Sequence, residues 1–171
     1  MLKQSKPVLK TSALTQTEAL LDFSLAESCS GIEMVQAAKL TNNASLAAGF
    51  IRHAIDEYRH ANIFNYISST TSVRHGLIGL NRYSTINAYN KKYINRDAFL
   101  FEKKSFGRFS IFVYISEKYA AKHFISIVTK DSILNKDEEQ LIESILSDEK
   151  NHINHAYNST LKFKSNNKLL Y

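Results

Sequence analysis

The residues best suited to chemistry occur in a short pattern that is present twice in the chain. The first copy is Asp56–His60, with the sequence DEYRH, and the second is Asp148–His152, with the sequence DEKNH. Both lie in segments with helical periodicity, where a Glu and a His three positions apart project from the same face. Each copy therefore offers a carboxylate oxygen and an imidazole nitrogen to one point, and both atoms are ligands of divalent transition metals. Two such helices facing each other would form a pocket for two metal ions.

Four amphipathic segments would have to position these residues. They cover about 16–40, 44–67 and 106–130, with a fourth that starts near Asn135, where Asn135 and Glu138 have the spacing of a capping box. The inward positions expected from a spacing of three or four residues are Leu20, Phe23, Glu27, Ser30, Met34 and Ala37; Phe50, His53, Glu57, His60, Phe64 and Ile67; Phe109, Val113, Glu117, Ala120, Phe124 and Ile127; and Ile142, Ile145, Glu149, His152 and Ala156. Each stripe is apolar except at its centre.

The connection between the second and third helices is long. It covers about 68–105, contains Gly76, Gly79 and many Asn, and includes a predicted short helix near 83–93. The turns within the outer pairs of helices are short, one of them at 41–43, so those pairs must be antiparallel hairpins. The sequence therefore predicts an all-α fold in a single domain, 1–171: a four-helix bundle with one long crossover between helices 2 and 3. Its core would span about 16–160, with loose tails at 1–15 and 161–171.

Glutamates on the first and third helices complete the candidate set. Glu27 precedes the first turn by about as many residues as the first motif copy follows it, so at roughly 1.5 Å of rise per residue they share one level. Glu33 is the alternative on the same helix, but it would lie roughly 9 Å nearer the turn. Glu117 stands in the same relation to the second turn. The predicted metal ligands and catalytic residues are Glu27, Glu57, His60, Glu117, Glu149 and His152.

This set resembles the ligands of the ferritin-like di-iron carboxylate family, where one Glu from each of two helices joins a Glu-x-x-His from each of the other two. The resemblance covers about 16–157. It implies a ferritin-like bundle that binds two iron ions, or a Mn/Fe pair, and uses O₂ as a co-substrate. The first motif copy also has the Asp-Glu-x-Arg-His pattern of oxygen-activating members, such as bacterial multicomponent monooxygenases and ribonucleotide reductase small subunits.

The resemblance also implies partners for the ligating histidines. Asp56 would orient His152 and Asp148 would orient His60, each across the bundle. Arg59 belongs to the same outer shell of the site in the first copy. The second copy departs from the pattern, because Asn stands at position 151 where Arg would be expected.

Further side chains are placed near the site by their position along the helices. Tyr114 is one turn before Glu117 and is predicted to lie near the metals. His53 is one turn before Glu57; it could be an additional ligand, but we favour a hydrogen-bonded core histidine. An apolar substrate pocket beside the metals is predicted to be lined by Phe50, Phe64, Val113 and Phe124.

Composition narrows the class of protein. The chain has a formal net charge of +6, a single cysteine, Cys29, and no run of about 18 or more apolar residues. An intrachain disulfide and a cysteine-based zinc site are therefore excluded, and no membrane segment is expected. The N-terminal residues lack the apolar stretch of a signal peptide, so a cytoplasmic protein is expected. The segment 74–108 is basic, but a solvated loop is the default interpretation, and no motif supports a nucleic-acid partner.

The function expected from these features is that of a di-iron oxidase or oxygenase. It would oxidise a small-molecule substrate with electrons from a separate donor, and a homodimer is left open. Ferroxidase or iron-handling activity and peroxide reduction are the alternatives. The basic charge and the lack of an acidic cluster outside the proposed centre favour the enzyme over iron storage. A metal-free bundle would leave the buried carboxylates unexplained.

Overall fold

A computed structural model describes residues 6–77, 105–129 and 133–167 of the chain. These residues form four α-helices and no strand: α1 (Lys6–Leu40), α2 (Ala44–Arg74), α5 (Phe106–Thr129) and α6 (Lys136–Asn167). The predicted all-α class is therefore confirmed for this part of the chain. The short helix expected near 83–93 lies outside the described residues.

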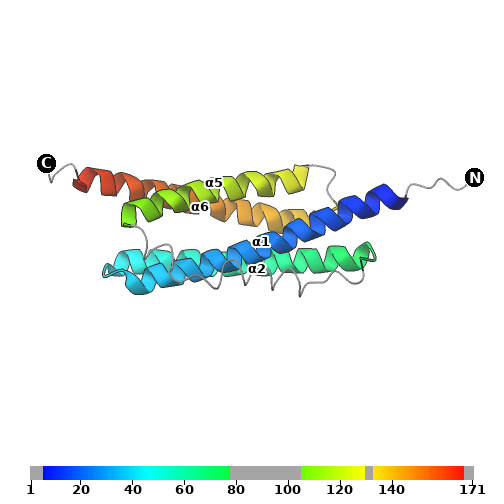
Figure 1. Cartoon of the computed structure of the whole chain (residues 1–171), viewed down its shortest axis with the longest axis horizontal. Helices are drawn as coiled ribbons and strands as arrows, with labels where there is room; N and C mark the ends of the chain where they lie inside the picture. The colour runs from blue at the N-terminus through cyan, green and yellow to red at the C-terminus, as the bar shows by residue number, and fades with distance from the viewer. Residues whose placement is uncertain (1–5, 78–104, 130–132, 168–171) are drawn as a thin grey trace, which may run out of the picture.

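The helices are arranged as two long hairpins (Figure 1). α1 packs against α2, α5 packs against α6, and α2 also contacts α6. In Figure 1, α5 begins at the end of the molecule opposite to the one where α2 ends. The connection between these two helices therefore has to join opposite ends of the molecule, as a crossover in a four-helix bundle does.

The first and last helices, α1 and α6, are longer than the apolar periodicity predicts. α1 begins at Lys6 and α6 continues to Asn167, so residues 6–15 and 161–167, assigned to loose tails from the sequence, are helical. Pro7 stands in the first turn of α1, where its missing N–H would have no helical partner. An apolar stripe marks only the part of a helix that packs in a core, so it underestimates the length of a helix that extends beyond the core.

Asparagine caps start the second helix of each hairpin. The side chain of Asn43 accepts a hydrogen bond from the backbone N–H of Leu46 at 3.0 Å. The predicted capping box of α6 is present: the N–H of Glu138 donates to Oδ1 of Asn135, and the N–H of Asn135 donates to Oε2 of Glu138, both at 2.9 Å. Arg74 also donates to Glu138 at 2.6 Å. The start of α6 is thus attached to the end of α2.

Two apolar clusters fill the core. The Phe64 cluster contains Leu20, Phe64, Ile67, Phe124, Leu134, Ile142 and Ile145, and the Phe50 cluster contains Met34, Ala37, Phe50, Ala54, Phe109, Val113 and Ala156. The four residues predicted to line one substrate pocket are divided between them: Phe64 and Phe124 belong to the first cluster, and Phe50 and Val113 to the second. These four side chains therefore lie in two apolar clusters, and the predicted ligands occupy the middle of the stripes between them.

The buried face of α1 contains four of the six predicted stripe positions and differs from the prediction at the other two. Phe23 and Ser30 are only half-buried, whereas the next residues, Ser24 and Gly31, are buried. The hydroxyl of Ser24 donates to the carbonyl oxygen of Ala61 on α2 at 2.7 Å. A Cβ atom at Gly31 would lie 3.1 Å from the ring of Tyr58 on α2. Small residues thus let α1 approach α2 closely, which a search for large apolar residues does not detect.

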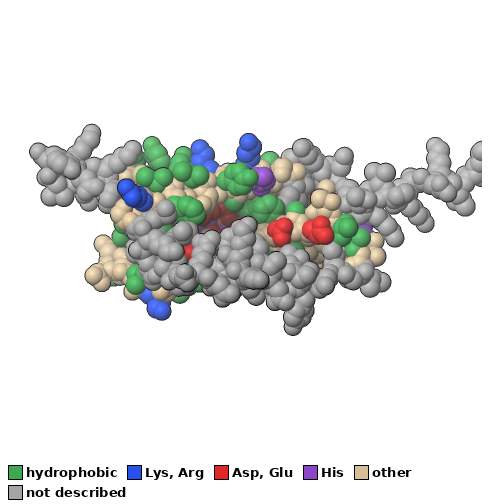
Figure 2. Space-filling model, in the orientation of Figure 1, with side chains coloured by type: hydrophobic (Ala, Val, Ile, Leu, Met, Phe, Trp, Pro, Cys, Tyr) green, Lys and Arg blue, Asp and Glu red, His purple; other side chains and the backbone are tan. Residues whose placement is uncertain are grey.

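The outer surface of α5 is more apolar than a typical helix surface. None of the described helices is both long enough and apolar enough to cross a membrane. However, Ile111, Phe112, Ile115 and Tyr119 of α5 are each at least 41% exposed. In Figure 2, hydrophobic side chains gather along the upper edge of the molecule, where Figure 1 places α5.

Candidate metal centre

The structure brings all six predicted ligands into one layer between the apolar clusters, together with His53. None of these seven side chains is more than 7% exposed. They form two groups of four, and the ligand atoms within each group lie within 4.8 Å of one another. The imidazole-rich group is His53, Glu57, Glu117 and His152, and the carboxylate-rich group is Glu27, Glu57, His60 and Glu149. Glu57 belongs to both groups.

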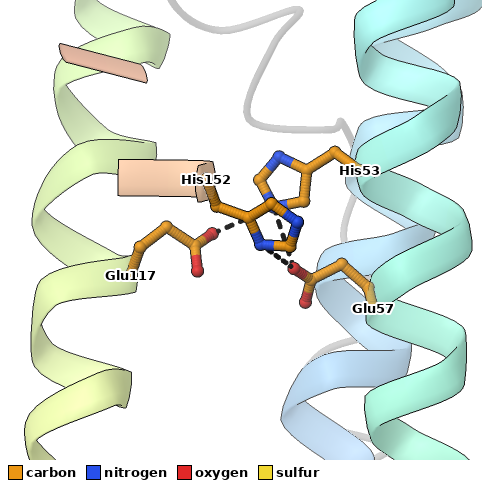
Figure 3. A group of neighbouring side chains, drawn as sticks. All are labelled: His53, Glu57, Glu117 and His152. Carbon is orange, nitrogen blue, oxygen red and sulfur yellow. Dashed lines mark ion pairs between the residues drawn. The ribbon is translucent and has the colours of Figure 1, made fainter. Parts of the chain in front are cut away.

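The imidazole-rich group converges on the carboxylate of Glu57 (Figure 3). Oε1 of Glu57 is 2.8 Å from Nε2 of His53 and 3.4 Å from Nδ1 of His152. The same Nε2 of His53 is 3.2 Å from Oε1 of Glu117, which points in from α5. The two imidazole rings are stacked, with centroids 3.8 Å apart. Side chains from α2, α5 and α6 therefore surround one small volume.

The carboxylate-rich group is centred on His60. Its Nδ1 is 3.2 Å from Oε1 of Glu149 and 3.7 Å from Oε2 of Glu27. Glu149 also interacts with Glu117 of the other group. The two groups are therefore adjacent and are connected through the glutamates of both motif copies, Glu57 and Glu149.

Each motif histidine is contacted on its outer side by an aspartate of the other hairpin. Nε2 of His152 is 3.2 Å from Oδ2 of Asp56, and Nε2 of His60 is 3.3 Å from Oδ2 of Asp148. This is the crossed pairing implied by the resemblance. A carboxylate next to Nε2 favours the tautomer with its proton on that atom, which leaves Nδ1 as a lone-pair donor toward the cluster. Arg59 donates a hydrogen bond to Asp148 and so supports the second of these contacts.

Buried polar atoms without hydrogen-bond partners are concentrated in this layer. Seven such side-chain atoms occur in the described part of the chain, and all except the Thr17 hydroxyl belong to His53, Glu57, His60, Glu149 and His152. An unsatisfied buried polar group costs roughly 1–3 kcal/mol. All six atoms become lone-pair donors when the side chains are in their ligating forms. A divalent cation would satisfy several of them at once, so the residues present fit a metal site.

Burial and crowding shift the pKa values of the ligands in opposite directions. Burial, and then the neighbouring carboxylates, raise the pKa of Glu57 well above its usual value, and burial together with the adjacent Glu117 raises the pKa of Glu149 to about 12. Burial alone would raise the pKa of Glu117, but its contacts with His53 and Glu149 outweigh that effect and lower it to about 2. Burial, and then the charge of His53, lower the pKa of His152 to about 4. Without a cation, these shifts favour the protonated forms of Glu57 and Glu149 and the uncharged form of His152.

His53 is the site residue that sequence reasoning interpreted differently. Its buried Nε2 lies 2.8 Å from Glu57 and 3.2 Å from Glu117, so His53 faces two carboxylates of the candidate centre and is placed where a ligand would be. The signal was available: His53 is on the stripe of Glu57, one turn earlier. On α1, Glu27 belongs to the carboxylate-rich group, whereas Glu33 is in neither group. The ligand choice made from helical rise is thus the one that the geometry favours.

The described contacts of Tyr114 are with residues outside the two ligand groups. Its hydroxyl accepts a hydrogen bond from Nζ of Lys118 at 3.3 Å, and its ring centroid is 5.7 Å from that of Tyr157 on α6. The ring packs against the Phe50 cluster.

A shallow groove of about 530 Å³ runs along α2, outside the layer of six predicted ligands and His53. It is lined by Ile55, Tyr58, Arg59, Asn62, Ile63 and Tyr66 of α2 and by Leu141 of α6. Arg59 connects this groove to the centre, because it also contacts Asp148, the outer partner of His60. A molecule bound in the groove would therefore lie next to the carboxylate-rich group.

No family model, curated protein or solved structure matches the chain. The function has to be inferred from the geometry of the site.

Proposed function

We propose that the chain is a ferritin-like dinuclear metalloprotein that binds two iron ions and uses O₂ to oxidise a small organic substrate. The observation that carries the proposal is the sharing of Glu57 by two groups of buried ligand atoms. A carboxylate has two oxygens and can bridge two ions, so a shared Glu is expected between the halves of a dinuclear centre. The distribution of ligands over the helices supports the same conclusion, because it follows the pattern of ferritin-like di-iron and di-manganese proteins.

Charge and distance both support two divalent ions. The four glutamates of the layer, Glu27, Glu57, Glu117 and Glu149, carry four negative charges when ionised, which two divalent cations would neutralise. Metal–ligand bonds of about 2.0–2.2 Å place ligands on opposite sides of one ion roughly 4.0–4.4 Å apart. The 4.8 Å limit within each group is close to that separation. Mixed imidazole and carboxylate donors suit iron, or manganese where carboxylates dominate.

The protein would contribute orientation, proton control and protection from water. Bound iron would supply the redox chemistry for O₂ activation. Asp56 and Asp148 would hold the two motif histidines with Nδ1 directed inward. The apolar clusters on both sides of the layer exclude water from it, which strengthens every electrostatic interaction inside. Glu57 and Glu149 would release their protons when they become ligands.

Partners follow from the exposed surfaces. An electron donor is part of the proposal, and the groove beside Arg59 is the place where a donor could approach the Asp148–His60 contact. A homodimer would bury the apolar outer face of α5. The net charge of +6 favours an oxidising enzyme over iron storage, because storage routes for cations are usually acidic.

The iron content of the protein tests this proposal. The chain is loaded anaerobically with Fe²⁺, free metal is removed, and iron is measured per chain. About two ions per chain are expected, and O₂ should then be consumed when a reductant is present. A value near zero would contradict the proposal, and hundreds of ions per chain would indicate storage instead.

A matched pair of variants on α6 tests the ligand assignment. Glu149→Ala should abolish binding at the carboxylate-rich group and abolish O₂ consumption. Glu143→Ala, at an exposed position of the same helix, should leave both unchanged. Equal behaviour of the two variants would contradict the assignment.

A further inference from the structure

His53 has no counterpart in the second half of the site. Counting four residues back from the motif glutamate leads to His53 on α2 but to Ile145 on α6. Ile145 is fully buried in the apolar Phe64 cluster. The two halves therefore match in their glutamates and motif histidines but differ at this position, which faces the candidate ligands.

The extra histidine changes the donor set of one metal position. The imidazole-rich group offers two imidazoles and two carboxylates, whereas the carboxylate-rich group offers one imidazole and three carboxylates, with Glu57 counted in both. Imidazole donors favour Fe²⁺, Co²⁺ and Zn²⁺, and carboxylate donors favour harder ions such as Mn²⁺ and Mg²⁺. The extra carboxylate would attract any cation more strongly, but it adds no preference for the softer ions.

The nitrogen–oxygen contacts of the imidazole-rich group are on average shorter than those of the carboxylate-rich group. Nε2 of His53 lies 2.8 Å from Glu57 and 3.2 Å from Glu117, and Nδ1 of His152 lies 3.4 Å from Glu57. In the other group, Nδ1 of His60 lies 3.2 Å from Glu149 and 3.7 Å from Glu27. Ligands that already converge lose less conformational freedom when an ion binds.

We infer that His53 makes the two metal positions unequal, so that a first Co²⁺ or Fe²⁺ ion binds to the imidazole-rich group and a second binds more weakly to the carboxylate-rich group. The inference rests on the dinuclear function proposed above. It assigns His53 the role of a metal ligand and assigns the order of loading to this single side chain. The alternative, in which His53 only packs beside the site, leaves the imidazole-rich group with one imidazole and two carboxylates and predicts that the carboxylate-rich group, with three carboxylates, binds the first ion.

The test is a titration of the whole chain with Co²⁺, followed by calorimetry and by ¹H NMR. Paramagnetic Co²⁺ shifts the ring signals of ligating histidines far outside their normal range, so the number of shifted rings identifies the occupied group. Two shifted histidines are expected at one equivalent, His53 and His152, and a third, His60, at two equivalents. One shifted histidine at one equivalent, or all three at half intensity, would overturn the inference.

Variants at position 53 give a second readout. His53→Ala should weaken the first binding step by more than the roughly 10–100-fold that loss of an outer partner of a ligand costs, while the step assigned to His60 remains. His53→Ile introduces the residue that stands at the counterpart position and should behave in the same way, with a better-filled core. His123→Ala on α5, whose ring packs 4.3 Å from Tyr119, is the control and should not change either step.

The outcomes separate this inference from the proposed function. If the wild-type chain binds no Co²⁺ and no Fe²⁺, the dinuclear proposal itself fails. If it binds two ions with equal affinity, or if both His53 variants keep the first step, the dinuclear proposal stands and the inference is overturned. If the variants do not fold, the count of shifted rings in the wild-type protein decides alone.

Discussion

The hairpin of α1 and α2 and the hairpin of α5 and α6 contribute equivalent sets of candidate ligands to the buried layer of glutamates and histidines. Each has a glutamate on its first helix and a Glu-x-x-His on its second, and each supplies an aspartate that contacts a histidine of the other hairpin. One turn before the motif glutamate, however, the first hairpin has His53 and the second has Ile145. The shared residues are those that a dinuclear layer requires. The residues that differ, such as His53 and Ile145, are the ones expected to give the two proposed metal positions different affinities.

A second difference concerns the outer support of the histidines. Arg59 in the first motif copy contacts Asp148, which holds His60. The equivalent position in the second copy is Asn151, and Asp56, which holds His152, is 36% exposed. The contact between Asp148 and His60 is therefore supported by an extra charged partner, and the contact between Asp56 and His152 depends more on the aspartate alone.

The largest expected effect comes from the ligand that both groups share. Glu57→Gln removes the charge and half of the donor capacity of the carboxylate between the two groups, so the iron content should fall from about two ions per chain to near zero. Glu27→Gln affects only the carboxylate-rich group and should leave about one ion per chain. Iron analysis after anaerobic loading measures both.

A control and a contrary result define this test. Glu143→Gln, at an exposed position of α6, should retain about two ions per chain. If Glu27→Gln loses as much iron as Glu57→Gln, the two groups are not separable and the comparison between them breaks down.

The next largest effect is expected from the outer aspartates. Asp148→Asn should weaken metal binding at the carboxylate-rich group, and Asp56→Asn at the imidazole-rich group, each by about 10–100-fold, because the ligating imidazole loses its orienting partner. Arg59→Asn places in the first motif copy the asparagine that the second copy has at position 151. It should weaken metal binding by less than either aspartate variant does. Stepwise Co²⁺ affinities distinguish these effects. A loss in the same step for both aspartate variants would contradict the crossed pairing.

The ligand layer could be predicted from the sequence because helical spacing fixes which side chains share a face and a level. Glu27 was separated from Glu33 by helical rise alone, and all six stripe positions of α2 are buried as predicted. The role of His53 could not be predicted from helical spacing. Whether a histidine on an inward stripe packs, donates a hydrogen bond or acts as a ligand depends on what faces it from other helices, and here Glu117 of α5 faces it.

The substrate pocket was the weakest prediction, for a related reason. Phe50 and Phe64 lie on one stripe, but 14 positions apart, on opposite sides of the metal layer. Periodicity shows that such residues share a face, but it does not show that they border one cavity.

A smaller expected effect is the release of protons when metal binds. It tests a feature that the two hairpins share, a buried glutamate with a raised pKa. Each hairpin contributes one glutamate whose pKa is raised, Glu57 and Glu149. Loading with two divalent ions at pH 7 should therefore release up to about two protons per chain, and affinity should rise with pH. Glu149→Gln should reduce the release by about one proton. Titration in weak buffer with a pH indicator measures it, and a release independent of Glu149 would contradict the assignment.

The same pKa shifts predict how the stability of the metal-free protein changes with pH on each side of its maximum. Above the unfolded-state pKa of about 4.5, the folded chain holds more protons on Glu57 and Glu149 than the unfolded chain does, so stability falls as pH rises from about 6 to 9. On the acid side, the pKa of Glu117 is about 2 in the folded chain against the usual 4.5, so the unfolded chain binds more protons and stability falls as pH decreases from about 4.5 to 2. His152, whose pKa is lowered from 6.5 to about 4, offsets only part of the effect of the two glutamates between those values. Melting temperatures with a chelator should show both slopes. Bound metal should remove the alkaline slope.

The smallest effects are expected where the hairpins turn. Asn43 caps α2 through one exposed hydrogen bond to Leu46. Asn135 caps α6 in a reciprocal pair with Glu138, which is 2% exposed and is held by Arg74 of α2. Asn43→Ala should therefore lower the free energy of unfolding by about 0.5–1 kcal/mol and Asn135→Ala by about 1–2 kcal/mol, as measured by urea unfolding of the metal-free protein. Equal losses would mean that the attachment of Glu138 to α2 adds nothing to the cap. A larger loss at Asn135 would show that the second hairpin is fixed to the first at this end as well as through the metal layer.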